Sequence, residues 1–588
     1  MWPWKKSKEE FVEFQNYSAI SSDFIPLGYI TDNEKRKVEI VGTNHERRQI
    51  VVVAREKDEY TVRHRIDTPI VVDYIVSIDI INREKKREYI AVSRIAGAKT
   101  ENEHKGVQQH VKIKTKNSQR EEKVQYSITK IDETGHTLSL GISDSMPFLI
   151  THKDLDPALF VQKDGETFFL DIAENVKYSS KEPFGVLRNN HSSGFVDVSG
   201  NGIADLVLDT VKNGKRTVEV WSTNNGEYTL TGSLDMSDES SGPFVFGDFT
   251  GTGAMDILYL SNDQPSINII PNMRPAYCTN GSQTSTPLFT RDKNSQSIPC
   301  LFKSDIMKAS SQSGYSAEDK ITYNIEDISE FKLYDSNGPV FPSVLDINSN
   351  TYPDIIVLAQ KNNAPSFQPS LFLNEGGTGF THEDAFDELP GKVKMAAFYR
   401  EDKGVWNVLA SSLVDSSSTL FIYRNTSDIS GYYLSISTKI EREKGSHVPA
   451  IGASYACRIT ETGRVIVGSY PAQSGYVTMQ SPVTVLGLGR TNVFISSLHS
   501  RVPNEKYRMG IAQDKIVPNS ELMMEVTNNH IRNSLYLNAN AYWPIAIPVI
   551  LTILFTLVII TAYFSMKTKR YTKNKTKRTR YDVTFGAL

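Results

Sequence analysis

Short runs of apolar, β-branched and aromatic residues recur along the chain before residue 540, and polar turn residues separate them. Examples are RKVEIVGT, TVEVWSTN, DIIVLAQ and LFIYRN. Runs of this length and alternation predict strands, and this part of the sequence lacks the sustained 3.6-residue periodicity of an amphipathic helix. The pattern therefore predicts an all-β protein of short strands joined by turns.

The pattern changes near the C-terminus, where WPIAIPVILTILFTLVIITAYFSM runs from Trp543 to Met566 without a charge. As a helix, such a run is long enough to cross about 30 Å of hydrocarbon. Pro544 and Pro548 fall in its first turns, where proline costs little. The sequence predicts one transmembrane helix over residues 543–566 and a tail over residues 567–588.

The formal net charge of −3 hides a strongly basic tail. Its basic residues are Lys567, Lys569, Arg570, Lys573, Lys575, Lys577, Arg578 and Arg580. The positive-inside rule places this tail in the cytoplasm and the preceding chain outside, which is a type I topology. The cluster either only stops transfer or also contacts anionic lipid. Nothing in the overall charge points to nucleic acid.

The first residues, MWPWKKSKEEFVEFQNYS, contain no apolar segment of the kind found in a signal peptide. We therefore expect that a leader is missing from this version of the sequence. The alternative is a tail-anchored protein whose β-rich part lies in the cytosol. Glycosylation triplets suit an outside location. They begin at Asn16, Asn190, Asn280 and Asn425.

Three segments repeat one pattern: FVDVSGNGIADLVLDT, FGDFTGTGAMDILYLS and SVLDINSNTYPDIIVLA. Each has an aspartate, polar residues at the third and fifth places, and a second aspartate at the ninth place before an apolar strand. Asp197 and Asp248 are 51 positions apart, and Asp248 and Asp346 are 98 apart. A period near 50 is the size of a propeller blade, and the doubled spacing holds an insertion with two cysteines.

Four degenerate copies keep the strand–turn–strand shape but lack the acidic residues, and they begin at Leu27, Ser77, Pro157 and Ala396. Three clear and four degenerate copies predict a seven-bladed β-propeller over about residues 1–430. We expect a small β-sandwich-like domain over residues 431–538. The fold class is all-β, with one transmembrane helix added.

Alternating oxygen-bearing residues in a tight loop suit Ca²⁺, which takes six to eight oxygen ligands. Glycine at the sixth place permits the sharp turn, although Thr351 replaces it in the third loop. The candidate ligands are Asp197, Ser199, Asn201, Ile203 and Asp205; Asp248, Thr250, Thr252, Ala254 and Asp256; and Asp346, Asn348, Asn350, Tyr352 and Asp354. With two carboxylates in each loop, we expect weak, structural calcium binding. In the alternative reading, these side chains only shape hairpin turns.

The chain has three cysteines, an odd number that excludes a disulfide framework. Cys278 and Cys300 bracket a polar stretch, and they form either a loop disulfide or two free thiols. Cys457 lies in a run that predicts a strand, where we expect a small buried side chain.

No nucleophile elbow, HExxH motif, CxxC pair or Gly-rich phosphate loop occurs in the sequence, so we do not expect an enzyme or a small-molecule substrate. The leading hypothesis is a surface protein that binds an extracellular or cell-surface protein through one face of the propeller. A carbohydrate-binding propeller, with Trp221 or Trp406 as sugar platforms, is one alternative. A tail-anchored cytosolic scaffold is the other.

The three acidic segments resemble the FG-GAP repeats of integrin α-chain propellers, and FGDFTGTGAMD is the nearest match. After them, SGYVTMQ, GLGR and PNSEL occur in that order before the apolar run and the basic tail. This arrangement resembles the T-cell immunomodulatory protein family, also called integrin-alpha FG-GAP repeat-containing protein 1. The region from Ala450 to Phe494 is also similar to the ASPIC/UnbV β-domain. The resemblance implies a type I membrane glycoprotein with a signal peptide, involved in cell adhesion and immune-cell modulation.

Overall fold

A computed structural model describes the chain between residues 14 and 585. The residues outside the description are 1–13, 22–24, 33–36, 45, 57–58, 82–86, 96–123, 153–154, 173–174, 201, 225–226, 237–240, 273–314, 316–318, 336–337, 401–405, 415–416, 427–430, 444–445, 460–463, 471, 474–475, 477–482, 491–493, 496, 504–510, 514, 528–530, 538–542 and 586–588. The chain divides into two compact parts, Met1–Tyr536 and Leu537–Leu588.

The strands of the first part include seven antiparallel sheets that are each built around four strands. The first is β2 (Ile25–Asp32), β3 (Lys37–Thr43), β4 (Gln49–Glu56) and β5 (Glu59–Asp67); the second is β6 (Tyr74–Ile81), β7 (Arg87–Ile95), β8 (Gln125–Asp132) and β9 (Thr137–Ser143); the third is β10 (Phe148–His152), β11 (Leu155–Lys163), β12 (Glu166–Asp171) and β13 (Lys177–Ser179); the fourth is β14 (Gly194–Val196), β15 (Asp205–Lys212), β16 (Lys215–Asn224) and β17 (Glu227–Asp235).

The remaining three sheets continue the series along the chain. The fifth is β18 (Val245–Gly247), β19 (Asp256–Ser261), β20 (Ser266–Ile270) and β21 (Ile321–Asn324); the sixth is β25 (Ser343–Leu345), β26 (Asp354–Lys361), β27 (Gln368–Asn374) and β28 (Phe380–Glu383), with β22 (Ile328–Phe331) also paired to β26; the seventh is β29 (Lys392–Arg400), β30 (Trp406–Val414), β31 (Ser417–Asn425) and the N-terminal strand β1 (Phe14–Ser21). A short ribbon, β23 (Tyr334–Asp335) with β24 (Gly338–Pro339), precedes β25.

The N-terminal strand completes the last of these sheets. β1 pairs antiparallel with β31, from Phe14 opposite Asn425 to Ser21 opposite Thr419. Pairing between the two ends of a series of antiparallel sheets fits a propeller, which leaves only short edges uncovered. The all-β prediction is confirmed, whereas the count of seven blades stays a prediction.

The apolar core lies between neighbouring sheets. One cluster joins Val196 and Val218 of the fourth sheet to Ile257 and Ile270 of the fifth. A second cluster includes Trp406, which is 6% exposed, and Trp221 is 4% exposed in a third cluster. Both tryptophans therefore serve packing, and neither offers a surface platform for a sugar.

The strands after residue 430 form a β-domain of two small sheets. Its strands are β32 (Tyr432–Glu443), β33 (Ser446–Pro449), β34 (Ser454–Arg458), β35 (Val465–Ser469), β36 (Ala472–Gln473), β37 (Thr484–Gly489), β38 (Ser497–Arg501), β39 (Ile511–Gln513), β40 (Ser520–Val526) and β41 (Ile531–Leu537). One sheet has the order β41-β40-β32, with β33 and β37 also paired to β32, and the other has the order β35-β34-β38-β39. Cys457 of β34 is fully buried, as predicted.

The β-domain is joined to the preceding sheets by strand pairing. β33 pairs with β6 of the second sheet, and β36 pairs with β14 of the fourth. Tyr476, just after β36, is 1% exposed and lies edge-on to Tyr74, with ring centroids 5.6 Å apart. Its ring also stacks with that of Phe341, just before β25 of the sixth sheet, with centroids 6.5 Å apart. One short segment of the β-domain thus contacts sheets two and six, and residues 1–536 form a single compact part.

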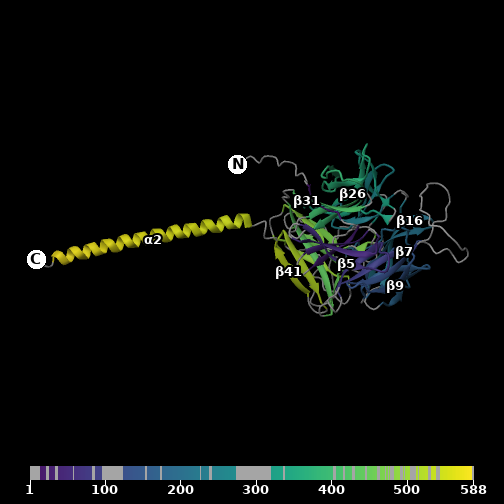
Figure 1. The fold of residues 1–588 in the computed structure, drawn as a ribbon, viewed down its shortest axis with the longest axis horizontal. Helices are drawn as coiled ribbons and strands as arrows, with labels where there is room; N and C mark the ends of the chain where they lie inside the picture. The colour runs from purple at the N-terminus through teal and green to yellow at the C-terminus, as the bar shows by residue number, and fades with distance from the viewer. Residues whose placement is uncertain are drawn as a thin grey trace, which may run out of the picture. The chain divides into compact units, whose positions relative to one another are not determined.

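The second compact part is dominated by α2 (Trp543–Phe585), drawn as one continuous helix in Figure 1. Its apolar segment is long enough and apolar enough to cross a membrane. The predicted span of 543–566 lies inside this helix, but the helix does not end there. It continues through the basic tail, where Thr568 and Thr572 donate their hydroxyls to carbonyls four residues earlier.

Candidate functional site

The three acidic segments form the same loop in the structure, and we call them the Asp loops 197–205, 248–256 and 346–354. Each joins the first strand of its sheet to the second, and its ninth residue begins that second strand. The φ angles at the fourth place are 66°, 69° and 56°, and those at the sixth place are 79°, 79° and 83°. Thr351 therefore adopts the left-handed conformation that glycine takes in the other two loops. Threonine in place of glycine at this position therefore leaves the backbone conformation of the loop unchanged.

One degenerate copy is out of register with these loops. The copy at Pro157 covers β11 and β12, the second and third strands of the third sheet. The Asp loops instead join first and second strands, so the equivalent link in the third sheet lies at residues 153–154. The insertion after Asp248 lies between β20 and β21 of the fifth sheet, and it replaces no sheet.

The aspartates of all three loops accept hydrogen bonds from their own backbone. The first aspartate accepts from the N–H at the sixth place: Gly202 to Asp197 at 2.7 Å, Gly253 to Asp248 at 3.1 Å and Thr351 to Asp346 at 2.7 Å. The ninth accepts from the start of the loop: Ser199 to Asp205 at 2.7 Å, Thr250 to Asp256 at 2.9 Å and Ile347 to Asp354 at 2.9 Å. These bonds fulfil the turn-shaping role of the alternative reading.

The loops differ in the carboxylate oxygens that remain for a cation. In loop 346–354 both aspartates are fully engaged: Asp346 also accepts from Asn350 N–H at 3.0 Å, and Asp354 from Asn374 N–H at 2.7 Å. In loop 248–256, by contrast, Oδ1 of Asp248 is buried and has no hydrogen-bond partner. Loop 248–256 therefore fits a cation better than loop 346–354 does. Asn201 of the first loop lies outside the described residues.

The described part of the chain contains no group of three or more His, Cys, Asp and Glu side chains arranged to hold a metal. A calcium ion here would depend on carbonyls and hydroxyls beside one or two carboxylates, which means weak binding. Ser199, Ile203, Thr252, Ala254, Asn348 and Tyr352 keep their predicted places in the loops. Calcium binding stays a prediction.

Burial changes the titration of these aspartates. It raises the pKa of Asp248 to about 7, and the negative charge of Asp256 adds to the effect. Burial likewise raises the pKa of Asp256 to about 6 and that of Asp346 to about 7. Arg464 opposes the shift at Asp248 and Asp346. Around pH 7 a fraction of the Asp248 and Asp346 carboxyl groups is therefore still protonated.

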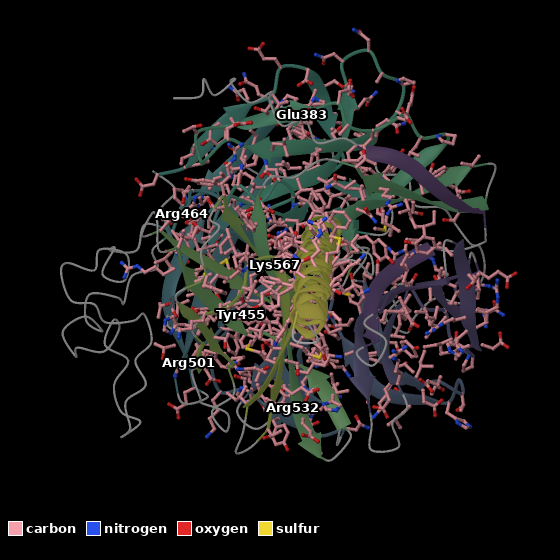
Figure 2. All side chains as sticks on the ribbon, turned by 90° about the vertical axis from the view of Figure 1, so that its left-hand side faces the viewer. Glu383, Tyr455, Arg464, Arg501, Arg532 and Lys567 are labelled. Carbon is pink, nitrogen blue, oxygen red and sulfur yellow. The ribbon has the colours of Figure 1, made fainter. Side chains whose placement is uncertain are left out.

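Arg464 brings the β-domain into contact with two Asp loops (it is labelled in Figure 2). Its guanidinium donates to the carbonyl oxygen of Thr351 at 3.0 Å and to the hydroxyl of the same residue. It also lies over the ring of Tyr352, 3.7 Å from the centroid. A Cβ at Gly251, in the neighbouring loop, would collide with Arg464 and Tyr352. Sequence reasoning missed Arg464, because 113 residues separate it from Thr351 and no local pattern marks it.

Two asparagines link neighbouring Asp loops. Asn374 donates its side-chain amide to the carbonyl of Phe249 in the preceding loop at 2.9 Å and to that of Pro353 in its own loop at 3.3 Å. Asn272 does the same one sheet earlier, with Val198 at 2.8 Å and Met255 at 3.2 Å. The sequence carried a signal for them, since SLFLN ends the third strand of its sheet with Asn374, and NIIPN places Asn272 two residues after the third strand of its sheet.

A cavity of about 150 Å³ lies between the Asp loops and the β-domain. Its lining includes Asp248, Asp346, Phe398, Ser469, Thr484 and Gly487. A side chain at Gly487 would overlap the carboxylate of Asp346, so this close approach requires glycine. The first glycine of the GLGR motif thus allows the β-domain to pack closely against Asp loop 346–354.

The other predicted site residues are separate from this region. Cys278, Cys300 and Asn280 lie outside the described residues, and only the backbone of Asn16 is described, in β1. Asn190 is half-buried, with a φ of 60°. Asn425 is 7% exposed in β31, an environment that leaves little room for a glycan. Glycosylation stays a prediction at these positions.

These features define a class: an all-β protein in which propeller-type sheets with Asp loops are joined to a β-domain, with one long apolar helix. A family model described as "ITFG1, C2 domain" matches residues 445–536, a region that includes the ASPIC/UnbV-like stretch from Ala450 to Phe494. A T-cell immunomodulatory protein homolog of Plasmodium yoelii yoelii is 23% identical over 454 residues, 66% of this chain and 63% of that protein. The T-cell immunomodulatory protein of Homo sapiens is 22% identical over 371 residues, 58% of this chain and 56% of that protein. Residues 445–536 thus match the ITFG1 C2 domain, and the chain is similar to these T-cell immunomodulatory proteins at low identity.

The chain matches less than two thirds of the length of these curated relatives. Among solved structures, a functionally unknown protein from Desulfotomaculum acetoxidans DSM 771 aligns with a TM-score of 0.34 and 10% identity, over 64% of this chain and 90% of that one. That score is too low to bear on the fold.

Proposed function

We propose that this protein is a single-pass, type I membrane protein whose propeller and β-domain are displayed outside the cell, where they bind another protein in adhesion or surface signalling. One observation carries the proposal: a large β-rich part without a recognised catalytic motif is followed by a helix that can cross a membrane and a basic tail. The apolar helix and the similarity to T-cell immunomodulatory proteins both fit a membrane protein, and this supports the proposal. Binding rather than catalysis is the proposed activity.

Protein binding is favoured over sugar binding by the burial of Trp221 and Trp406. Fused antiparallel sheets also form a rigid scaffold on which exposed turns can recognise a partner.

The test is the topology of the full-length chain in cells, with and without an added leader. A tag at Lys181, an exposed residue of the β-rich part, should be accessible only from outside the cell. A tag at the C-terminus should be accessible only from inside. A glycosidase-sensitive gel shift should accompany this result. Accessibility of the Lys181 tag only after permeabilisation, under both conditions, would contradict the proposal and favour a tail-anchored cytosolic scaffold. If the Lys181 tag is accessible outside, proximity labelling from it identifies the bound surface protein.

We also propose structural calcium at the Asp loops, with loop 248–256 as the strongest candidate. The buried Oδ1 of Asp248 is available, and the neighbouring carboxyl of Asp256 supplies a second charge. Millimolar Ca²⁺ should raise the unfolding temperature of the full-length protein, whereas the Asp248→Asn variant should show a smaller rise. An equal rise in both proteins, or none in either, would rule out this loop.

A further inference from the structure

The basic tail continues the helix that contains the apolar segment (Figure 1). Thr568 donates its hydroxyl to the carbonyl of Phe564 at 2.8 Å, and Thr572 donates to that of Thr568. The residues on both sides of Met566 therefore belong to one continuous helix. Its rise of about 1.5 Å per residue gives the distance of each tail residue from the end of the apolar segment.

This rise places the first turn of the tail at the depth of lipid headgroups. The candidate span begins at Ile547, and residues 547–566 rise by about 30 Å, the thickness of the hydrocarbon core. The headgroup region adds about 5–7 Å on each side. Lys567, Lys569 and Arg570 lie within about 6 Å of Met566 along the helix axis, so they fall in that layer.

Lys573 lies about 10 Å beyond Met566 along the axis. The Cα–Cβ bonds of a helix tilt toward its N-terminus, so the long side chain of Lys573 leans back toward the apolar segment. Lysine at a helix end commonly extends its ammonium to the interface in this way. We call Lys567, Lys569, Arg570 and Lys573 the cationic collar.

The charge of the collar has little compensation in the sequence around it. The sequence contains no acidic residue between Glu525 and Asp582. The side chains of residues 567–573 are exposed (Lys567 is labelled in Figure 2). Anionic groups in the surroundings would therefore meet an accessible, positively charged surface.

An aromatic residue within the collar supports this depth. Tyr571 is 75% exposed, and Tyr563, on the apolar side of Met566, is 56% exposed. The two tyrosines lie about 12 Å apart along the axis and bracket the end of the apolar segment. Tyrosine is enriched at membrane–water interfaces, because its ring suits the apolar side and its hydroxyl suits the headgroups.

Lipid fits the collar better than a protein partner does. Successive residues of a helix turn by about 100°, so Lys567 and Lys569 lie on nearly opposite sides, about 200° apart. A protein that docks on one side would reach only one of them, whereas lipids surround a membrane helix on every side. We propose that the cationic collar binds the headgroups of anionic phospholipids in the cytoplasmic leaflet. The inference rests on the proposed function and deepens it, because it names the lipid class that the inner end of the helix contacts.

The test measures the lipid selectivity of the full-length protein in vesicles by electron paramagnetic resonance, with spin-labelled phosphatidylserine or phosphatidylcholine as the probe. One cation at a charged surface changes affinity by about fivefold. Averaging over all lipids around the helix should leave a preference for phosphatidylserine of about twofold. The double variant Lys569→Gln with Arg570→Gln should lose at least about half of this preference. High salt should abolish it, because salt screens charges at the surface.

The chain offers a matched control, since the sequence Thr-Lys-Arg occurs at residues 568–570 and again at residues 576–578. Lys577→Gln with Arg578→Gln removes the same two charges about 12 Å farther along the helix. That distance exceeds the Debye length of about 8 Å at physiological salt, so this variant should keep the wild-type preference. A thermal melt of each variant separates lost selectivity from lost folding.

An absent preference in the wild type, or an equal loss in the two double variants, would overturn the inference. Binding of fluorescent hexaglutamate in neutral vesicles, without a preference for phosphatidylserine, would overturn it in favour of an acidic protein partner.

Alkaline carbonate extraction tests the proposed function separately. A protein that resists extraction but shows no lipid preference refutes the collar and leaves the proposed function standing. Release by carbonate refutes the membrane-spanning function whatever the lipid result. A C-terminal tag accessible only from outside the cell would refute the proposed topology, and with it the cytoplasmic leaflet as the binding surface.

Discussion

At the scale of single residues, the most informative side chains are those that connect one repeat to the next. The aspartates accept hydrogen bonds from the backbone of their own loops. Asn272 and Asn374, in contrast, each donate to carbonyls of two neighbouring loops. Both are buried, so a lost partner leaves carbonyls without a donor. The asparagines therefore contribute to the alignment of neighbouring sheets as well as to local turn shape.

Replacing Asn374 by alanine should lower the free energy of unfolding by about 1–3 kcal/mol, because two buried carbonyls lose their donor. The matched control is Asn324→Ala at an exposed position in β21, which should change stability by less than about 0.5 kcal/mol. Chemical denaturation followed by tryptophan fluorescence measures both. Equal stability of the two variants would show that the hydrogen bonds between the loops do not contribute to the free energy of unfolding.

Arg464 gives a second prediction at this scale. Arg464→Ala should lower the unfolding temperature, since Thr351 then holds its φ of 83° without two hydrogen bonds. Arg464→Lys should rescue little, because an ammonium cannot reproduce the planar fork. Adding Thr351→Gly should restore part of the loss, as glycine adopts that φ without strain. A strictly additive double-mutant cycle would show that Arg464 does not act through this residue.

At the scale of elements, repetition made much of the fold predictable. The ninth-place aspartate followed by an apolar strand located β15, β19 and β26. Degenerate copies were located with less accuracy, since the copy at Pro157 matched the wrong pair of strands in its sheet. The pairing of β1 with β31 had no signal, because backbone hydrogen bonds between edges leave no sequence pattern and the partners are about 400 residues apart.

Deletion of residues 14–21 should therefore destabilise the seventh sheet. It removes all partners of one edge of β31, which then exposes unpaired backbone groups and invites aggregation. Deletion of residues 1–8, of equal length, leaves β1 intact. Thermal melts and light scattering should show lower stability and more aggregation for the first deletion only. Identical behaviour of the two deletions would mean that β1 does not close the sheets.

At the scale of the whole molecule, the sequence predicted the fold class and the apolar helix, while the contacts between the β-domain and the sheets had to come from the structure. Arg464, Gly487 and Tyr476 all make such contacts. Their partners are distant in sequence and of unrelated types, so neither spacing nor composition indicates them. The acidic positions were predictable because a tight loop imposes its spacing locally.

The buried aspartates predict a pH dependence for the whole β-rich part. Asp248, Asp256 and Asp346 have folded pKa values of about 7, 6 and 7, above the ordinary 3.8. A raised carboxyl pKa means that the folded state holds protons more tightly, so stability falls as pH rises from about 4 to 7. Without calcium, the unfolding temperature should be higher at pH 5.5 than at pH 8. Asp248→Asn should reduce this difference, and a higher unfolding temperature at pH 8 would contradict the prediction.

The pairing of β1 with β31 also sets an order of events during synthesis. A ribosome adds about 5–20 residues each second, so the roughly 400 residues between these strands take about 20–80 s to appear. Throughout that interval the nascent chain carries a strand whose partner does not yet exist. Closure is thus among the last steps of maturation. An unpaired β1 can pair with other chains during this interval, so we expect translation speed and chaperone supply to influence the yield of folded protein.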